Sequence, residues 1–520
     1  MTAQLDPDRA YRLHDLVAHY AVVTPLAEAL VLGDRRFDYA GQAAAIDALA
    51  AAMIAAGVAR GDRVAALEPP GIDAWLSFLA CASIGAIWVG LNPRYRWTEL
   101  RHVLGDADPT LVFVRHGYAD AIDPYGPELA GKPLVWTGSG RTVSRGLLLD
   151  DFLAIGRAIA PGMLAARRAA VAPRDACLLV YTSGSTGTPK GALLHHEGIV
   201  AFALHQNAMW PVDPFRVLNY LPVNHIGCIV DIGAAALAAG GAMVFLEQFD
   251  PATSLGLMAA ERISVWGSVP SVFRMQLDDP SFVTTNLSAV QLIVWGGAAM
   301  GIDLIDTLAR FCPRLATNYG MTETSSAITA LAPTDDRELL AGSVGEPLSG
   351  VEVRLAGEAG PVEQPEVPGE VLTRSRLNFL GYWRNPAATA AAFDADGYFR
   401  TGDVGMWRED GRLALVGRTK EMFKSGGYNV YPLEIEQVIE AHPAVAMVAV
   451  VGKPDPLWQE VGCAFVMPRD TVTVDGLLDW CRTRLANYKI PKQVVIVEMM
   501  PLLPIGKIDK AALKRRAALC

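Results

Sequence analysis

Short apolar runs alternate with longer, helix-like segments through the first half of the chain. An alanine-rich stretch predicts a helix that ends near Ile54, an apolar run predicts a strand over residues 63–67, and a second helix begins at Asp73. The alternation recurs with helices at residues 200–207 and 254–261 and with strands at residues 242–246 and 265–268. Helices that alternate with short apolar strands are typical of parallel sheets covered on both faces. The pattern predicts an α/β fold whose large N-terminal domain is built of doubly wound mixed sheets.

Residues 74–91 carry no charge and form a stretch about as short as a membrane-spanning helix can be. Two features favour another interpretation. Gly71 precedes a helix start at Asp73, and Gly85 separates this helix from an apolar run that ends at Pro93. We therefore expect a helix and a buried strand of the α/β core, without stable membrane insertion.

The pattern changes twice in the second half of the chain. After Gly342 it becomes a series of short strands punctuated by Gly and Pro (VEVRLAG, PGEVLTRS and GYFRTGDVG), which predicts a small β-rich subdomain. Near Arg418 a second change begins, and Pro432 followed by acidic residues marks a strong helix start beyond it. We therefore predict an N-terminal domain at residues 1–418, which includes a β-rich subdomain at residues 342–418. A small α+β C-terminal domain follows at residues 419–520.

Composition narrows the class of protein. A chain of 520 residues with 51% hydrophobic residues exceeds what one core holds, and its net charge of −10 lacks the basic excess of nucleic-acid-binding proteins. The seven cysteines are scattered without a C-x-x-C pair, so neither a disulfide framework nor a zinc site is predicted. Charges at Asp6, Asp8 and Arg9 do not resemble a secretory signal. We expect a cytoplasmic enzyme that does not bind nucleic acid.

The strongest motif is YTSGSTGTPKG at residues 181–191, directly after an apolar strand. Glycines and small hydroxyl residues let backbone N–H groups close around phosphate oxygens, and a lysine adds positive charge. The motif is not a Walker loop, because Pro189 precedes the lysine and Gly191 follows it. The predicted phosphate-binding residues are Thr182, Ser183, Gly184, Ser185, Thr186, Gly187 and Lys190.

This loop resembles the signature loop of the adenylate-forming superfamily, which includes acyl-CoA synthetases, luciferases and the adenylation domains of peptide synthetases. Other motifs similar to those of the superfamily follow in the same order: GGA at residues 296–298, NYGMTET at 318–324, TGD at 401–403, GRTKEMFKSGG at 417–427 and PIGKID at 504–509. The resemblance extends over nearly the whole chain. It implies ATP, Mg²⁺ and coenzyme A as ligands.

The resemblance also implies roles for the residues in these motifs. Tyr319 would stack on adenine, Thr322 would touch phosphate, and Glu323 with Thr186 would hold magnesium. Asp403 and Arg418 would bind the ribose. The remaining residues implied to contact ATP are Gly297, Ala298, Asn318 and Gly320.

Catalysis of two successive steps is implied to require a mobile C-terminal domain. Lys507 would bridge the acyl carboxylate and the α-phosphate, and Lys420 would be the hinge about which the domain rotates. Rotation would bring Lys424, Gly426, Gly427 and Tyr428 to the site, where the glycines would line the path of the coenzyme A arm. Gly-Gly is also common in plain turns. His225 matches the residue that gates the thiol path, but a histidine buried in the core is the alternative.

The acyl pocket is predicted to be apolar, with Cys228, Trp266, Trp295 and Gly296 among its lining residues. This composition favours an uncharged acyl body: a medium or long aliphatic chain, or an aromatic or alicyclic ring. Asp231 fits either a pocket or an exposed helix face, and the sequence leaves that choice open.

The predicted function is therefore that of an ATP-dependent acyl-CoA synthetase. The main alternative is a free-standing adenylation enzyme that loads a carrier protein, although residues 223–226 read VNHI where an amino-acid-activating member would have Phe-Asp-x-Ser. A luciferase-like oxygenase and a non-catalytic scaffold are weaker alternatives. The oligomeric state is open, with a homodimer as one option.

Overall fold

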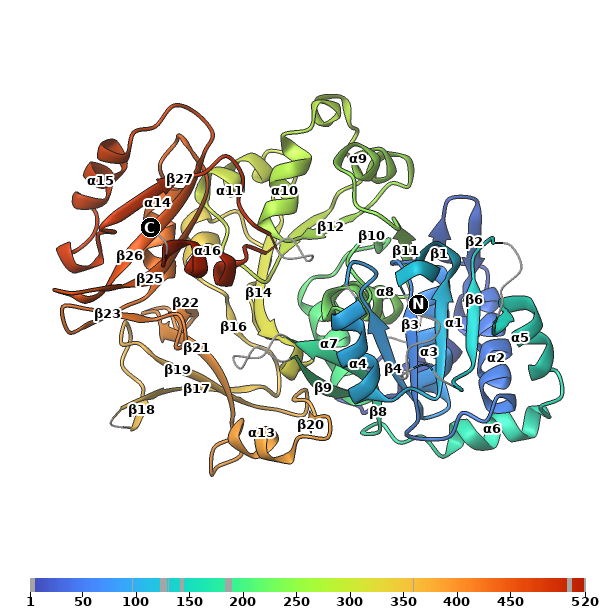
Figure 1. Ribbon diagram of the computed structural model, residues 1–520. Coiled ribbons are helices and arrows are strands. Elements are labelled where there is room, and N and C mark those ends of the chain that lie inside the picture. The colour runs from blue at the N-terminus through green and yellow to red at the C-terminus, as the bar shows by residue number, and fades with distance from the viewer. Residues whose placement is uncertain are drawn as a thin grey trace.

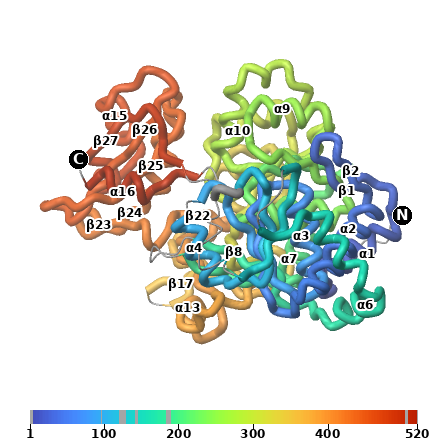
Figure 2. Tube along the Cα trace, turned by 45° about the vertical axis from the view of Figure 1, so that its right-hand side comes forward, coloured from blue at the N-terminus to red at the C-terminus, as the bar shows by residue number. Residues whose placement is uncertain are grey.

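The computed structural model describes residues 5–95, 97–121, 129, 131–140, 145–182, 189–358, 360–502 and 507–518. Its elements form three sheets in the N-terminal part of the chain and a fourth in a C-terminal lobe, which stands beside the rest of the molecule in both views (Figures 1 and 2). The predicted mixed α/β fold with a small C-terminal domain is confirmed.

The first sheet is a mixed one that carries part of the candidate site. Its strands, in spatial order, are β16 (Glu346–Pro347), β15 (Ser326–Ala330), β14 (Leu315–Met321), β13 (Leu292–Trp295), β12 (Val265–Ser268), β10 (Arg216–Asn219), β11 (Ala242–Phe245), β1 (Glu28–Leu32) and β2 (Arg35–Asp38). The interior strands pair in parallel, whereas the pairs at both edges are antiparallel. Helices α9 (Pro251–Ala260), α10 (Pro270–Leu277), α11 (Ile302–Ala309) and α12 (Arg337–Gly342) join or flank these strands.

The second sheet has the same doubly wound character. Its order is β20 (Gly381–Tyr382), β9 (Lys190–His195), β8 (Ala176–Thr182), β4 (Ile87–Leu91), β3 (Arg63–Leu67), β5 (Leu111–Arg115), β6 (Leu134–Thr137) and β7 (Leu147–Leu148). The associated helices are α1 (Leu13–Val23), α2 (Tyr39–Ala55), α3 (Ile72–Ser83), α4 (Trp97–Ala107), α5 (Leu149–Gly156), α6 (Pro161–Ala169), α7 (His196–Met209) and α8 (Ala235–Ala238).

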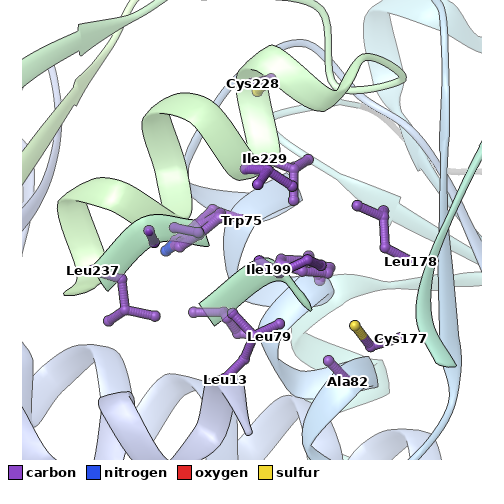
Figure 3. Packing of buried hydrophobic residues seen from close by; sticks show 14 of the residues in the cluster. Leu13, Trp75, Leu79, Ala82, Cys177, Leu178, Ile199, Cys228, Ile229 and Leu237 are labelled. Carbon is purple, nitrogen blue, oxygen red and sulfur yellow. The ribbon is translucent and has the colours of Figure 1, made fainter. Parts of the chain in front are cut away.

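The main hydrophobic core lies between helices that belong to both sheets. Leu13 of α1, Trp75 and Leu79 of α3, and Ile199 of α7 converge there, as Figure 3 shows. Ile229 joins them from η3 (Gly227–Ala234), a π-helical segment that runs directly into α8. The uncharged stretch at residues 74–91 thus forms α3 and β4, as expected. Within the described residues, no helix has both the length and the apolar character needed to span a bilayer.

The third sheet follows the predicted β-rich pattern, with strands β18 (Gly360–Val362), β17 (Glu352–Gly357), β19 (Gly369–Arg374), β21 (Phe399–Trp407) and β22 (Leu413–Arg418), beside helix α13 (Pro386–Ala391). The C-terminal lobe contains β24 (Tyr428–Val430), β23 (Phe423–Ser425), β26 (Gln459–Pro468), β25 (Val445–Asp455) and β27 (Gln493–Ile496). Its helices are α14 (Pro432–Glu440), α15 (Val474–Arg482) and α16 (Lys510–Ala517). A segment of only a few residues, 419–422, joins β22 to β23.

Candidate active site

Three strands bring Tyr319, Asp403 and Arg418 together. The Tyr319 hydroxyl of β14 donates a 2.8 Å hydrogen bond to Asp403 Oδ2 of β21. Arg418 Nε of β22 lies 2.7 Å from the other oxygen, Oδ1, because Asp403 and Arg418 are paired across the two strands. Burial raises the pKa of Asp403, and the nearby Arg418 charge opposes that rise. The result is a buried carboxylate of fixed orientation, suited to accept hydrogen bonds from a diol such as ribose.

Glycines let the chain approach closely beside Tyr319. A Cβ atom on Gly320 would lie 1.9 Å from the Ser326 carbonyl oxygen, so the β14–β15 pairing requires glycine there. A Cβ on Gly296 would lie 2.5 Å from Asn318 Oδ1. The segment at residues 296–298 and the segment that begins at Asn318 are therefore neighbours in space. Thr322 is buried in η5 (Thr322–Thr324), directly after β14.

Glu323 is a buried carboxylate that accepts hydrogen bonds from two hydroxyl groups. The Tyr382 hydroxyl donates to Glu323 Oε1 at 3.0 Å, and Thr182 Oγ1 lies 3.4 Å from the same oxygen. Within the described part of the chain Glu323 forms no ion pair, and burial raises its pKa. A bound cation would satisfy this carboxylate.

Magnesium fits this environment, because it is commonly held by one or two carboxylates together with substrate phosphates. The described residues contain no cluster of three or more His, Cys, Asp or Glu side chains that could hold a metal by themselves. Glu323 would therefore share the ion with phosphate oxygens. The predicted phosphate-loop residues Ser183, Gly184, Ser185, Thr186 and Gly187 lie outside the described residues.

Tyr382 is a site residue that the sequence analysis missed. Its strand, β20, pairs with β9, which begins at Lys190, and Lys190 Nζ lies 5.4 Å from the centre of the Tyr382 ring. The same tyrosine therefore contacts both Glu323 and the lysine of the phosphate loop. A lone tyrosine in a two-residue strand carries no sequence signal for this role.

Lys507 reaches the site from the C-terminal lobe. A Cβ atom added to Gly297 would lie 3.0 Å from Lys507 Cε and 3.1 Å from Nζ, so the side chain lies directly against Gly297. Burial lowers the pKa of Lys507 and the Arg418 charge lowers it further, whereas Asp403 and Asp231 favour the charged form. Lys507 thus lies within electrostatic range of the Asp403 carboxylate.

Contacts on both sides of Lys507 hold its segment in place. Leu502 and Ile508 form an antiparallel bridge around it. Asp509 caps α16 by accepting a 2.9 Å hydrogen bond from the Ala512 N–H, and Lys510 Nζ forms ion pairs with Glu421 at 2.9 Å and Glu436 at 2.8 Å. The described residues that directly follow Lys507 are therefore anchored to the C-terminal lobe.

His225 lies within the electrostatic range of Lys507. Its Nδ1 accepts a 3.1 Å hydrogen bond from the Gly227 N–H. Burial, followed by the Lys507 charge, lowers the pKa of His225 to about 4. The imidazole is therefore neutral at pH 7, and because Nδ1 is an acceptor, the proton lies on Nε2.

The residues predicted to act in the second step lie elsewhere. Lys424, Gly426, Gly427 and Tyr428 belong to the β23–β24 hairpin, and β23 is on the outer side of the C-terminal lobe in Figures 1 and 2. Their surroundings belong to that lobe: the Lys424 N–H donates to Glu460 Oε2 at 3.2 Å, and the Tyr428 ring stacks on Tyr488 with 4.4 Å between centres. Lys420 is exposed in the connection between β22 and β23. In this conformation the site therefore contains Lys507 and not Lys424.

A cavity beside Asp231 has a lining that differs from the predicted one. Its volume is about 40 Å³, measured as the space open to the centres of water molecules, and β12 and β13 contribute Val265, Gly267, Leu292 and Val294 to its wall. Trp266 and Trp295 alternate with these residues and pack into a separate core on the other face of the sheet. Cys228 is buried in the main core. None of these three residues, nor Gly296, is among those that line this cavity.

Comparison with known proteins identifies the family. The family model described as "AMP-binding enzyme" matches residues 17–383, and that of the AMP-binding enzyme C-terminal domain matches residues 434–507. The chain is 34% identical over 501 residues to a feruloyl-CoA synthase of an Amycolatopsis species, a match that covers 95% of this chain and 97% of the relative. It is 32% identical over 502 residues to a long-chain-fatty-acid–CoA ligase of Mycobacterium tuberculosis, covering 95% and 96%.

A solved structure agrees with these sequence matches. The amide bond synthetase of Marinactinospora thermotolerans superposes with a TM-score of 0.82 at 29% identity, covering 94% of this chain and 97% of that one. Both the family models and the curated relatives span most of the chain. The chain therefore belongs to the adenylate-forming superfamily of AMP-binding enzymes, and it is an enzyme of the AMP-forming acid–thiol ligase class.

Proposed function

We propose that this enzyme is an ATP-dependent acyl-CoA synthetase that activates an acid with an apolar body through an acyl-adenylate. The observation that carries the proposal is the meeting of Lys507 with Gly297 close to the Tyr319–Asp403–Arg418 cluster. The Lys507 ammonium group of the C-terminal lobe thus lies close to the buried Asp403 carboxylate of the N-terminal part, which is suited to accept hydrogen bonds from a diol.

In the first half-reaction a carboxylate oxygen of the acid attacks the α-phosphorus of ATP. A new O–P bond forms, and the P–O bond to pyrophosphate breaks. Two anions must approach each other, so a positioned cation lowers the barrier. Lys507 supplies that cation between the carboxylate and the α-phosphate. Glu323, together with Thr186, would hold a magnesium ion, which would supply positive charge to neutralise the departing phosphates.

In the second half-reaction the thiol of coenzyme A loses its proton to solvent, its sulfur attacks the acyl carbon, and the acyl–oxygen bond to AMP breaks. The C-terminal lobe rotates about Lys420, which withdraws Lys507 and brings the β23–β24 hairpin to the adenylate. His225 acts as a gate and not as a base, since its Nδ1 is occupied by the Gly227 N–H. Gly427, with open space where its Cβ would be, suits a wall against which the pantetheine arm lies.

The cavity supports a compact acid. The cavity has a volume of about 40 Å³, and one water needs about 10–15 Å³ by the same measure, so the cavity has room for about three waters. This favours an aromatic or alicyclic body over a long aliphatic chain, and one relative carries the name feruloyl-CoA synthase. The mainly apolar wall, with Val265, Leu292 and Val294, agrees with an uncharged ring.

The acceptor is the second part of the proposal. Similarity to an amide bond synthetase makes an amine one competing acceptor, and a carrier-protein thiol is the other. Coenzyme A is favoured because the curated relatives named above are CoA ligases, matched over more than nine-tenths of their length.

The proposal is tested by incubating the purified chain with ATP, Mg²⁺ and a panel of aliphatic, aromatic, alicyclic and dicarboxylic acids. We expect AMP and pyrophosphate in a coenzyme A-dependent manner, with acyl-CoA detected by mass spectrometry. Parallel reactions contain a carrier protein or a small amine in place of coenzyme A. Product formed only with an amine or a carrier would overturn the choice of acceptor, and no AMP with any acid would overturn the proposed function.

A further inference from the structure

The cavity described above is not uniformly apolar. Besides its aliphatic wall it is lined by three polar side chains: Gln206 and Asn207 of α7, and Asp231 of η3. Asn207 has a structural partner, since its Nδ2 donates a 2.9 Å hydrogen bond to the Ala235 carbonyl. Gln206 and Asp231 therefore set the polarity of the cavity.

Asp231 contributes the carboxylate among the residues that line the cavity. Ser326 Oγ donates a hydrogen bond to Oδ1. For the second oxygen, Oδ2, the described residues provide no hydrogen-bond donor. The Lys507 charge is close enough to favour the ionised form of Asp231, although burial raises the pKa of this carboxyl. The unpaired carboxylate oxygen therefore belongs to a residue that lines the cavity and lies within electrostatic range of Lys507.

The Gln206 side chain is in a similar position. Only 9% of the residue is exposed, and its amide forms no hydrogen bond with any described residue. Buried polar groups in folded proteins nearly always have partners. A buried amide and a half-paired carboxylate thus face one cavity with room for a few waters, so water or a bound molecule supplies the missing partners.

Resting on the function proposed above, we infer that this site selects a compact carboxylic acid whose ring carries a hydrogen-bond donor, a hydroxyl, amino or ring N–H group, held by Asp231 and Gln206. An acid without the donor would displace water from the cavity and leave both groups without partners. Sites that hydrogen-bond a substrate group reject the analogue that lacks it far more strongly than apolar pockets reject a missing methylene. Asp231 would also repel the second carboxylate of a dicarboxylic acid.

The π-helical geometry of η3 supports this assignment. Segment Gly227–Ala234 is wound with the wider π pattern, and such segments frequently occur at functional sites. Ile232, next to Asp231, lines the cavity and also belongs to the main core, in which Ile229 and Val230 are buried. The segment thus directs its one carboxylate towards the cavity while its other side packs the core.

The test compares acids in matched pairs. Hydroxy- and amino-substituted benzoates, phenylacetates and cinnamates are each paired with the fluoro-substituted acid of similar size. For the full-length enzyme we expect kcat/KM to favour the donor acid by about tenfold or more in at least one pair. In Asp231→Leu this ratio should fall towards one, and Gln206→Leu should reduce it in the same direction.

Asp231→Asn keeps an oxygen for Ser326 but removes the charge, so it should relieve the rejection of dicarboxylic acids. If thermal melting shows that Asp231→Leu is unfolded, the Asp231→Asn variant alone tests the role of the Asp231 carboxylate. Equal kcat/KM for donor and fluoro acids in the wild-type enzyme, or the same ratio and the same dicarboxylate rejection in Asp231→Asn, would overturn the inference. The wider function fails only if no acid yields AMP, so the two failures are distinguishable.

Discussion

Lys507 and Gly297 are in direct contact across the two lobes: the lysine Nζ lies 3.1 Å from the position that a Cβ of residue 297 would occupy. Gly297 has a φ of +78°, a conformation that glycine adopts readily and other residues rarely do. The backbone at residue 297 therefore makes room for the ammonium group. This contact joins the motif that contains Lys507 to the GGA segment at residues 296–298.

Gly297→Ala should impair adenylate formation. The added methyl group would displace Lys507, and the positive φ would add about 1 kcal/mol of backbone strain. We expect pyrophosphate release to slow by about tenfold or more, with a smaller effect on the reaction of preformed acyl-adenylate with coenzyme A.

Gly350→Ala is the matched control, because Gly350 has a φ of +72° and nothing within 4 Å of its Cβ position. It should carry the same backbone strain without the clash. If both variants lost adenylation activity equally, contact with Lys507 would not be the cause.

Tyr319→Phe should weaken the binding of ATP. The substitution removes the 2.8 Å hydrogen bond that orients Asp403 but keeps the ring that is proposed to stack on adenine. A hydrogen bond to a charged group contributes about 1.5–3 kcal/mol, so we expect KM for ATP to rise by about tenfold or more. Tyr398→Phe, which removes an exposed tyrosine–Glu352 bond, serves as the control and should leave KM for ATP unchanged.

Glu440 should make the balance of the two half-reactions depend on pH. It lies against Gly301 of the other lobe, and burial together with Asp303 and Glu436 raises its pKa from 4.5 to about 7, against the opposing Arg274 charge. Arg469 also reaches Asp303 across this interface, at 3.0 Å. Rotation of the C-terminal lobe would expose Glu440 and return its pKa towards 4.5.

The direction of the pH dependence follows from this difference in the pKa of Glu440 between the two conformations. The present conformation binds the proton more tightly, so Glu440 imposes no penalty on it below pH 4.5, and the penalty grows through the window from 4.5 to about 7. Glu440→Gln should therefore retain a larger pyrophosphate burst at pH 8, whereas wild type and variant should converge near pH 5. Parallel pH profiles of the two proteins would contradict this role. Glu363→Gln, at an exposed position, controls for loss of charge.

Much of the fold could be predicted because local pattern and tertiary structure agree. The strand at residues 63–67 and the strand at residues 265–268 have the predicted bounds as β3 and β12, and the uncharged stretch after Gly71 forms α3 and β4. Buried parallel strands appear in the sequence as short, nearly continuous apolar runs, and these runs can be recognised without a structure. The π-helical winding of Gly227–Ala234 could not be predicted, because nothing in its composition separates it from an α-helix.

Some residues of the site could likewise be predicted from the sequence, whereas others could not. Tyr319, Asp403 and Arg418 follow from motifs, and the structure brings them into direct contact. The cavity wall was harder to predict. Adjacent strand residues point to opposite faces of the sheet, so only one of the two sets can line the cavity. Apolar composition alone does not show whether Trp266 and Trp295 or their strand neighbours belong to that set. The choice between a pocket residue and a surface residue at Asp231 needed the position of Ser326, which lies far away in the sequence.

The central claim is that Lys507 acts on the first half-reaction alone. Lys507→Ala is measured in two assays, pyrophosphate release from ATP and acid, and acyl-CoA formation from preformed acyl-adenylate, with the exposed Lys514→Ala as control. We predict a loss of about 100-fold or more in the first assay and a near wild-type rate in the second. Unchanged pyrophosphate release, or an equal loss in both assays, would contradict the account.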